Sequence, residues 1–492
     1  MINQRIGRPS TPRADRRNPA WWIVPLGLAG CLLIGFVMGV RQSPMMAAAM
    51  LGAGISVAWV ALVVARPEFA LLIYTVLAVN LNSIDLPVPG GVRLSPDILL
   101  TSLLIVGVAL RALTMRRPVF SLPITAPYLI FLAVPMVTMI WSPTPVESMK
   151  GIFRFVSYYA IMWLIVDVIQ SKEQLRHMVV ALLLAPIIPI LTSFLQAATG
   201  GGQTIWAGEL FNRVYGLAGG PFTLAYFLVL LIPLVLIFLL ESSPEDAGSG
   251  VWQFRKGLLA LLLVGAGAAL LLTFIRGAWF ALVFAVLLLG LLRGSLRYRQ
   301  LLLTIPVVAG SVLLIFSPAL DRLEQVADPT STLFGRIEVW KLAVDWITTS
   351  PLAFLAGLGM KSFEYFYILQ AAPRIAGLYW RREAFLIGNR PHNEILGFWL
   401  DVGLIGLIAF IASLVIVIRQ AWRIFRRSDD QPLQLFALAF IIGSAGILFG
   451  AMGDNVFSQP SVASYFWIMA GLIMAITRHM MPAAVQDTAA TP

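Results

Sequence analysis

The chain has 492 residues, of which 59% are hydrophobic and only 12% charged, and its mean hydropathy is +0.86. Because soluble proteins carry about twice that share of charged residues, the composition excludes a soluble globular protein. The formal net charge of +11 indicates basic loops beside anionic lipid rather than a nucleic-acid partner. The single cysteine, Cys31, excludes an intramolecular disulfide, and no histidine pair or cysteine cluster predicts a metal site.

The apolar runs predict an all-α integral membrane protein with about 12–14 transmembrane helices. Residues 1–20 are polar and carry five arginines, which predicts a basic cytoplasmic tail rather than a cleaved signal peptide. Eleven spans are expected within residues 21–317 and three within 395–477, followed by a second cytoplasmic tail at 478–492. The expected spans lie near residues 21–40, 45–65, 69–80, 97–113, 124–141, 155–169, 178–198, 221–240, 257–275, 278–292, 301–317, 395–418, 433–450 and 461–477.

Lysine and arginine are distributed unevenly over the links between these spans. With the N-terminus inside, the inner links hold most of the basic residues. The short outer links hold only Arg41, Arg93, Lys150, Arg154, Arg213 and Arg276. This asymmetry follows the positive-inside rule and places the long segment 318–394 outside, with both termini in the cytoplasm. In a bacterium, that segment faces the periplasm from the inner membrane.

The outer segment 318–394 is a large loop that is expected to be helical, because about 77 structureless residues are uncommon in a compact protein. Residues 335–348 predict an amphipathic helix that lies on the membrane surface or caps the bundle. Its apolar face is expected to contain Ile337, Trp340, Val344 and Ile347. Ser350 and Pro351 are expected to end this helix, and Gly357 and Gly359 mark a turn after it.

A polar cluster runs directly into an apolar helix in the stretch NRPHNEILGFWLDVGLIG, residues 389–406. The cluster consists of Arg390, His392, Asn393 and Glu394. The chain has three histidines, and the other two, His177 and His479, lie beside arginines at expected cytoplasmic helix ends. His392 is therefore the candidate for a group that exchanges a proton near neutral pH. The structural alternatives are a capping or interface role for His392, a helix cap by Asn393, and a local ion pair between Glu394 and Arg390.

Arginines at the outer face form the second candidate group. Arg213 precedes a glycine-rich approach to a span, and Arg276 occupies a turn of three or four residues between two long apolar helices. A guanidinium inside or beside the membrane is costly without a partner, and its fixed, forked donors suit phosphate. Two or three arginines that converge would fit a pyrophosphate. Arg276 could instead reach the interface as a snorkelling side chain, Arg213 could be a loop charge, and Arg336 could lie on a solvated helix face.

Four segments together resemble the O-antigen ligase and polymerase superfamily of bacterial membrane glycosyltransferases. They are, in order, RVYGLAGGPFTLAYF, TFIRGAWFAL, GRIEVWKLAVDWITTSPLAFLAGLGMKSF and RPHNEILGFWLDVGLIGL. The resemblance covers residues 205–415, and the flanking spans agree only in topology. Glu394, the high number of spans and the basic N-terminal tail depart from the family pattern.

The resemblance implies a metal-independent, inverting transfer of a glycan from undecaprenyl diphosphate to an acceptor hydroxyl at the periplasmic face, without cofactor or nucleotide. The acceptor would be lipid A–core for a ligase, or another lipid-linked glycan for a polymerase of O-antigen or exopolysaccharide. His392 would be the general base, and Arg213 and Arg276 would bind the diphosphate. Further substrate contacts would come from Arg336, Arg390, Asn393 and Glu394. The extra spans favour the polymerase.

A transporter of a small anion or a lipid-linked glycan is the alternative from another class. Transporters place polar groups near the middle of the bilayer on broken helices. Here the charges gather at the outer face, with Asp167 and Asp401 as the nearest exceptions. A structural membrane scaffold is a third interpretation, but it gives no reason for the set of Arg213, Arg276 and His392.

Overall fold

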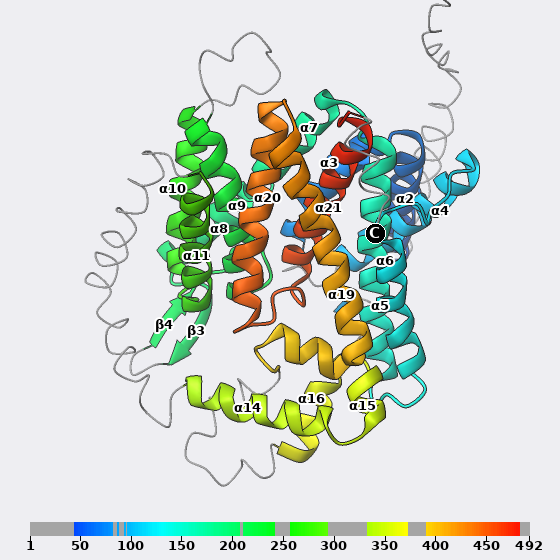
Figure 1. The fold of residues 1–492 in the computed structure, drawn as a ribbon, viewed down its shortest axis with the longest axis vertical. Helices are drawn as coiled ribbons and strands as arrows, with labels where there is room; N and C mark the ends of the chain where they lie inside the picture. Colours follow the sequence, from blue (N-terminus) through cyan, green and yellow to red (C-terminus); the bar gives the residue numbers. More distant parts are fainter. Residues whose placement is uncertain are drawn as a thin grey trace, which may run out of the picture.

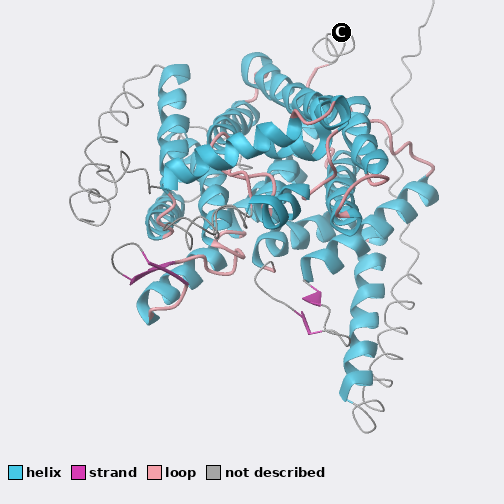
Figure 2. Cartoon of the chain, turned by 90° about the horizontal axis from the view of Figure 1, so that it is seen from below, coloured by secondary structure: helices cyan, strands magenta, loops and turns pink. Residues whose placement is uncertain are grey.

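The computed structural model describes residues 44–81, 86–87, 93–94, 96–206, 210–241, 256–293, 332–371 and 390–482. Within these residues the protein is a bundle of α-helices with two short hairpins beside it (Figures 1 and 2). The all-α membrane fold predicted from the sequence is thereby confirmed. The expected tail 1–20 and the expected spans 21–40 and 301–317 lie outside the described residues.

Seven helices of the described residues are long and apolar enough to cross a membrane, judged by length and composition. They are α6 (Pro145–Val168), α7 with α8 (Lys172–Leu184 and Ile187–Thr199), α9 (Pro221–Glu241), α11 (Arg276–Arg293), α19 (Glu394–Arg427), α20 (Gln431–Ala451) and α21 (Pro460–His479). Five shorter apolar segments belong to α2 (Pro44–Ala65), α3 (Pro67–Asn80), α4 (Pro96–Met115), α5 (Thr125–Thr138) and α10 (Lys256–Leu272). Each of these helices corresponds to an expected span.

Two expected spans have different boundaries in the structure. The span expected at 178–198 is divided into α7 and α8, with Pro186 just before the first residue of α8, because proline fits the start of a helix better than its interior. Helix α6 begins at Pro145 rather than near 155, and Glu147 in its first turn bonds Lys150 at 2.5 Å. Lys150 and Arg154, expected in an outer link, therefore lie in the first turns of α6.

Helices α9 and α21 are buried on every side and form the centre of the bundle, as expected for helices that are apolar all round. Glycines let α20 approach α9 closely. A Cβ at Gly443 would lie 2.8 Å from a Leu230 methyl group, and one at Gly450 would collide with the Tyr226 ring. This close packing holds the Tyr226 ring in place.

The described part of the large loop is helical, as predicted, and lies across one end of the bundle (Figure 1). It contains α14 (Thr332–Ile347), α15 (Pro351–Ala356), α16 (Ser362–Phe366) and a π-helical turn (Tyr367–Ala371). Ser350, expected to end α14, also caps α15 by accepting a hydrogen bond from Ala353 N at 3.1 Å. The described part of the loop is thus a set of helices that covers the end of the bundle.

The face that α14 buries against the bundle lies beside the apolar stripe predicted from the spacing. Val339, Ala343 and Trp346 are buried against α16 and α19, together with Ile347. Val344, expected on the apolar face, is 45% exposed. The small Ala343 permits close packing on the face that the helix actually buries. Ile337 and Trp340 of the predicted stripe are half-buried and line one groove together with Val344, and tertiary packing places the buried face beside this stripe, with Ile347 in the buried set.

A kink in α19 joins the loop to the bundle. Gly403 has φ 63° and ψ −179° within the helix, so the helical hydrogen-bond pattern is interrupted there. The carbonyl oxygens of Leu400 and Asp401 instead accept hydrogen bonds from Leu358 N and Gly359 N, at 2.8 and 3.0 Å. The kink therefore fixes the first part of α19 against the turn after α15.

Two antiparallel hairpins complete the described structure. Strand β1 (Leu86–Pro87) pairs with β2 (Arg93–Leu94). Strand β3 (Gln203–Trp206) pairs with β4 (Leu210–Arg213), with Gln203 opposite Arg213. The second hairpin lies between α8 and α9 in the chain and carries one of the candidate arginines at its end.

Candidate functional site

His392 lies in the short segment that leads into α19, at the end of the bundle covered by α14 (Figure 1). Its φ of 47° is uncommon for a residue other than glycine. The preceding carbonyl, of Pro391, accepts a hydrogen bond from Trp340 Nε1 of α14 at 2.8 Å. The large loop thus holds the backbone next to His392, and the imidazole remains half-buried.

The imidazole contacts a carboxylate from the link between α20 and α21. His392 Nδ1 lies 2.9 Å from Oδ1 of Asp454, and the two side chains are 15% and 6% exposed. Asp454 belongs to the α20–α21 link, residues 452–459. Because an ionised carboxylate only accepts hydrogen bonds, Nδ1 carries the proton in this contact. In the neutral imidazole, Nε2 then keeps its lone pair and can accept a proton.

Asp454 is also the meeting point of two further side chains. Its Oδ2 accepts a hydrogen bond from the Tyr226 hydroxyl of α9 at 3.3 Å. Arg336 Nη2, from α14, lies 4.0 Å from the same oxygen, and Arg336 Nη1 donates to the carbonyl of Gly453 at 2.8 Å. The carboxylate therefore joins a potential base, a hydroxyl and a guanidinium that come from three separate elements.

Arg276 was expected within a turn, whereas in the structure it is the first residue of α11, directly after a turn of residues 273–275. Its neighbour Gly277 faces the Asp454 group, because a Cβ there would lie 2.9 Å from the Tyr226 hydroxyl and 3.9 Å from Asp454 Oδ2. Arg336 reaches the same carboxylate from α14, with Nη2 4.0 Å from Asp454 Oδ2. The start of α11, which carries Arg276, and the Arg336 guanidinium thus both adjoin Asp454.

Asn393 and Glu394 tie the start of α19 to the α20–α21 link. Asn393 Oδ1 caps the helix by accepting from Leu396 N at 3.1 Å, and its Nδ2 donates to the carbonyl of Met452 at 3.0 Å. The Glu394 carboxylate is buried and accepts from Phe457 N at 2.8 Å and from Ser458 Oγ at 3.1 Å. These contacts hold the two segments that carry His392 and Asp454 at a fixed separation.

Arg390 and Arg213 are the two remaining candidate arginines. Arg390 is exposed, and Glu394 takes its hydrogen bonds from the α20–α21 link rather than from an ion pair with Arg390. Arg213 ends β4 and is half-buried. The next residue, Val214, donates its N–H to the carbonyl of Leu272 at the end of α10, at 3.3 Å. The hairpin that carries Arg213 therefore adjoins the turn that presents Arg276.

The sequence analysis did not identify Asp454 or Tyr226. For Asp454 a signal exists, because it is an acidic residue in a short link between two apolar runs on the same expected face as His392. Tyr226 gives no such signal, since it lies within a continuous apolar run. In the described part of the chain, no group of three or more histidine, cysteine, aspartate or glutamate residues could hold a metal ion.

The model of the O-antigen ligase family matches residues 259–411. The match covers the stretch of chain that carries Arg276, Arg336 and His392, whereas Arg213 and Asp454 fall outside it. No curated protein matches the chain. The match supports the O-antigen ligase and polymerase superfamily that the four sequence segments resemble.

Proposed function

We propose that this protein, whose O-antigen ligase domain supports its place in the O-antigen ligase and polymerase superfamily, transfers a glycan from an undecaprenyl-diphosphate donor to an acceptor hydroxyl. The domain supports a glycosyltransferase-type enzyme that acts on lipid-linked glycans in O-antigen or polysaccharide assembly. The specific donor, the periplasmic orientation, the stereochemistry and the roles of individual residues form our proposal.

The contact between His392 and Asp454 is the observation that carries this proposal. A histidine held by a carboxylate through Nδ1 presents its other nitrogen in a defined direction. Arg336 lies 4.0 Å from Asp454, and Arg276 directly precedes Gly277, which faces the same carboxylate. These two arginines would bind a group with two negative charges. A base and a cation pair in one place are the two components that transfer from a lipid diphosphate needs.

In the proposed reaction, His392 Nε2 removes the proton from the acceptor hydroxyl. The acceptor oxygen forms a bond to the anomeric carbon of the donor while the bond from that carbon to the diphosphate oxygen breaks. Attack from the side opposite the leaving diphosphate inverts the anomeric centre. The proton stays on the imidazolium, which the negative Asp454 stabilises, and passes to solvent after the product leaves.

The leaving diphosphate gains negative charge as the glycosidic bond breaks. Arg276 and Arg336 would stabilise this charge, since arginine offers paired donors and stays protonated. Arg213, at the adjoining hairpin, would bind the second phosphate. In this scheme Asn393 and Glu394 position His392 through the helix start, and Arg390, which is exposed, would meet the glycan rather than the diphosphate.

Asp167 and Asp401, the two acidic residues within expected spans, both have local hydrogen-bond partners. Asp167 pairs with Arg111 at 2.9 Å and also with Arg117, and the carboxylate of Asp401 accepts hydrogen bonds from the backbone of Lys361 and Ser362. Neither residue offers the midplane group that a transporter of anions would use. This arrangement favours the enzyme over the alternative of a transporter.

Glycan transfer by the purified full-length protein tests the proposal. The protein is given an undecaprenyl-diphosphate glycan with chelator and without nucleotide, and His392→Ala is compared with wild type and with His177→Ala. His177 lies at the other end of the bundle, so it serves as a matched histidine control. We expect transfer by wild type and His177→Ala, and loss of at least 10²-fold for His392→Ala.

The size of the product separates the two members of the proposed class. A ladder of products on the lipid carrier identifies a polymerase, which the high number of spans favours, and a single transfer to lipid A–core identifies a ligase. Transfer that persists in His392→Ala would remove the proposed base. A wild type that is inert toward several donors but moves the same lipid across a liposome membrane would instead establish transport.

A further inference from the structure

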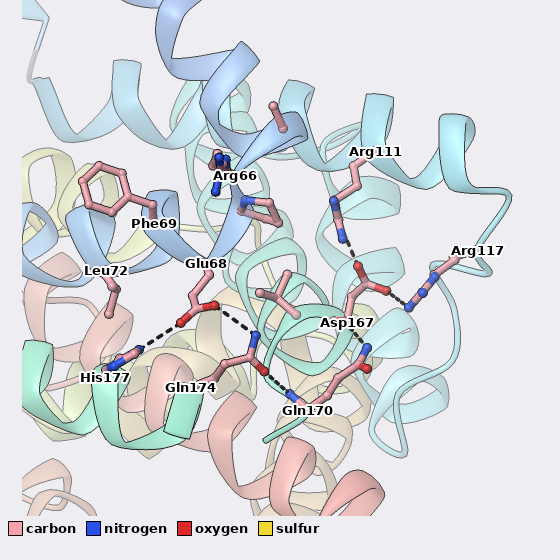
Figure 3. Close-up of a pocket in the computed structure, with 13 residues that line it drawn as sticks. Arg66, Glu68, Phe69, Leu72, Arg111, Arg117, Asp167, Gln170, Gln174 and His177 are labelled. Atoms are coloured by element: carbon pink, nitrogen blue, oxygen red, sulfur yellow. Dashed lines mark hydrogen bonds and ion pairs between the residues drawn. The ribbon is translucent and has the colours of Figure 1, made fainter. Parts of the chain in front are cut away.

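A polar cavity lies at the opposite end of the bundle from His392 (Figures 1 and 3). Its volume is about 580 Å³. The start of α3, the last turn of α6, the start of α7 and side chains from α4 and the link after it form its walls. The proposed glycan transfer uses none of these residues.

A buried carboxylate between two arginines forms one wall of this cavity. The side chain of Asp167 is only 4% exposed, and its Oδ2 accepts from Arg111 Nε at 2.9 Å while Oδ1 accepts from Arg117. Arg111 Nη1 also donates to the carbonyl of Val64 at 3.2 Å. One carboxylate balances the charge of only one guanidinium, and each guanidinium has five N–H donors. This wall therefore retains a positive charge and donors for a further anion.

Glu68, the second acidic residue of the cavity, contacts side chains of α7. Glu68 accepts from Gln174 Nε2 at 3.0 Å and lies 3.1 Å from His177 Nδ1, both on α7. Figure 3 shows the Glu68 carboxylate turned toward α7, away from the Asp167 group. With Arg66 included, the lining has three arginines against two carboxylates, so the cavity has an excess of positive charge.

One side of the cavity is apolar and open. Phe69 of α3 is 57% exposed, and Leu72 lies one turn further along the same helix. A site with arginines at a helix end and an exposed apolar wall beside them matches a phospholipid, whose phosphate lies at the membrane surface and whose acyl chains continue along the helices. A free phosphate would use the arginines but not the apolar wall.

We propose that this cavity binds the phosphate of an anionic phospholipid, with Arg66, Arg111 and Arg117 around the headgroup and Phe69 beside an acyl chain. The lipid would join α3, α4, α6 and α7, which meet at the cavity. It would do so at the end of the bundle that the basic links mark as cytoplasmic. The site is separate from the proposed transfer chemistry and does not depend on it.

Lipid retention by the full-length protein tests this site. Native mass spectrometry of the detergent-solubilised protein, titrated with phosphatidylglycerol, phosphatidylcholine or inorganic phosphate, gives the affinity for each. The variants are Arg117→Gln, which leaves Asp167 paired with Arg111, and the double variant Arg66→Gln with Arg117→Gln. The matched control is Arg419→Gln, an exposed arginine outside the cavity lining.

We expect wild type to retain phosphatidylglycerol in preference to phosphatidylcholine, and the double variant to bind phosphatidylglycerol at least about tenfold more weakly. Arg419→Gln should bind as wild type does. Phe69→Ala should weaken the binding of phosphatidylglycerol but not the binding of inorganic phosphate. Equal phosphatidylglycerol affinity in wild type and the double variant overturns the proposal. A third outcome is that inorganic phosphate binds tightly, that Phe69→Ala leaves this binding unchanged, and that the protein shows no preference for the lipid. This outcome overturns the proposal of a lipid ligand and assigns the cavity to a soluble phosphate.

Discussion

The Nδ1 atom of His392 lies 2.9 Å from Oδ1 of Asp454, although the two residues are 62 positions apart in the chain. One precedes α19 and the other follows α20, so the antiparallel packing of these helices returns the chain to the same end of the bundle. The contact sets the direction of the imidazole.

Replacement of Asp454 by asparagine should reduce transfer by about 10²–10³-fold, mainly in kcat. The amide cannot stabilise the imidazolium, and its NH₂ group can hold the imidazole in the wrong tautomer. Steady-state kinetics with the donor varied measure the effect, and Asp454→Glu should restore part of kcat. A loss confined to KM would show that Asp454 acts on donor binding instead.

Gly277→Ala should lower transfer, because the added Cβ would lie 2.9 Å from the Tyr226 hydroxyl and disturb its bond to Asp454. Removal of the hydroxyl in Tyr226→Phe creates space. The rise in activation free energy of transfer in the double variant should therefore be smaller than the sum of the rises in the two single variants. The expected difference is about 0.5–1.5 kcal/mol. Gly267→Ala is the matched control, since a Cβ there meets nothing within 4 Å. Additive single effects would contradict the proposed clash.

Neutral substitutions of Arg276 and Arg336 should each reduce kcat/KM by about 10²–10³-fold, because each removes a charge beside the proposed leaving group. Arg390→Gln should cost less, because that side chain is exposed. Transfer is measured with the natural donor and with a donor that has a better leaving group. The better leaving group should recover part of the rate for Arg276→Gln, and equal losses with both donors would argue against stabilisation of the diphosphate.

Glu394→Ala should destabilise the protein by about 1–3 kcal/mol, because it leaves the buried Phe457 N–H and the Ser458 hydroxyl without their acceptor. Glu394→Gln keeps one carbonyl oxygen and should be milder. The melting temperature in detergent measures the effect. If Glu394→Ala melts as wild type does but loses transfer completely, Glu394 contacts the substrate rather than positioning the start of α19.

Gly357→Ala should loosen the large loop. Gly357 has φ 84°, and a Cβ there would lie 2.5 Å from Gly403 N and 2.6 Å from the Asp401 carbonyl, so the backbone contact between the loop and α19 must open. Hydrogen exchange of α14 and α16 should become faster, and Gly257→Ala, in open space, should leave it unchanged. Unaltered exchange in Gly357→Ala would show that α14 and α16 are held independently of this turn.

Several features followed from local sequence alone. The length and hydropathy of the apolar runs predicted the helices, because a span must be apolar over its whole length and satisfy its own backbone. The helix of residues 335–348 was also predicted, whereas Arg276, expected within a turn, is the first residue of α11. The sequence left open which side of the helix of residues 335–348 packs on the bundle, and the packing partners select Val339, Ala343 and Trp346.

The sequence by itself determined that this is a multi-pass membrane protein and that His392, Arg276 and Arg336 are candidates for chemistry, since composition, hydropathy and local motifs are properties of the chain. Only the tertiary structure decided which of them meet. Asp454 contacts His392 across 62 residues of chain and Tyr226 across 228, and no local sequence pattern encodes contacts over such separations. These contacts depend on how α9, α11, α14, α19 and α20 pack, and that packing is set by many side-chain contacts at once.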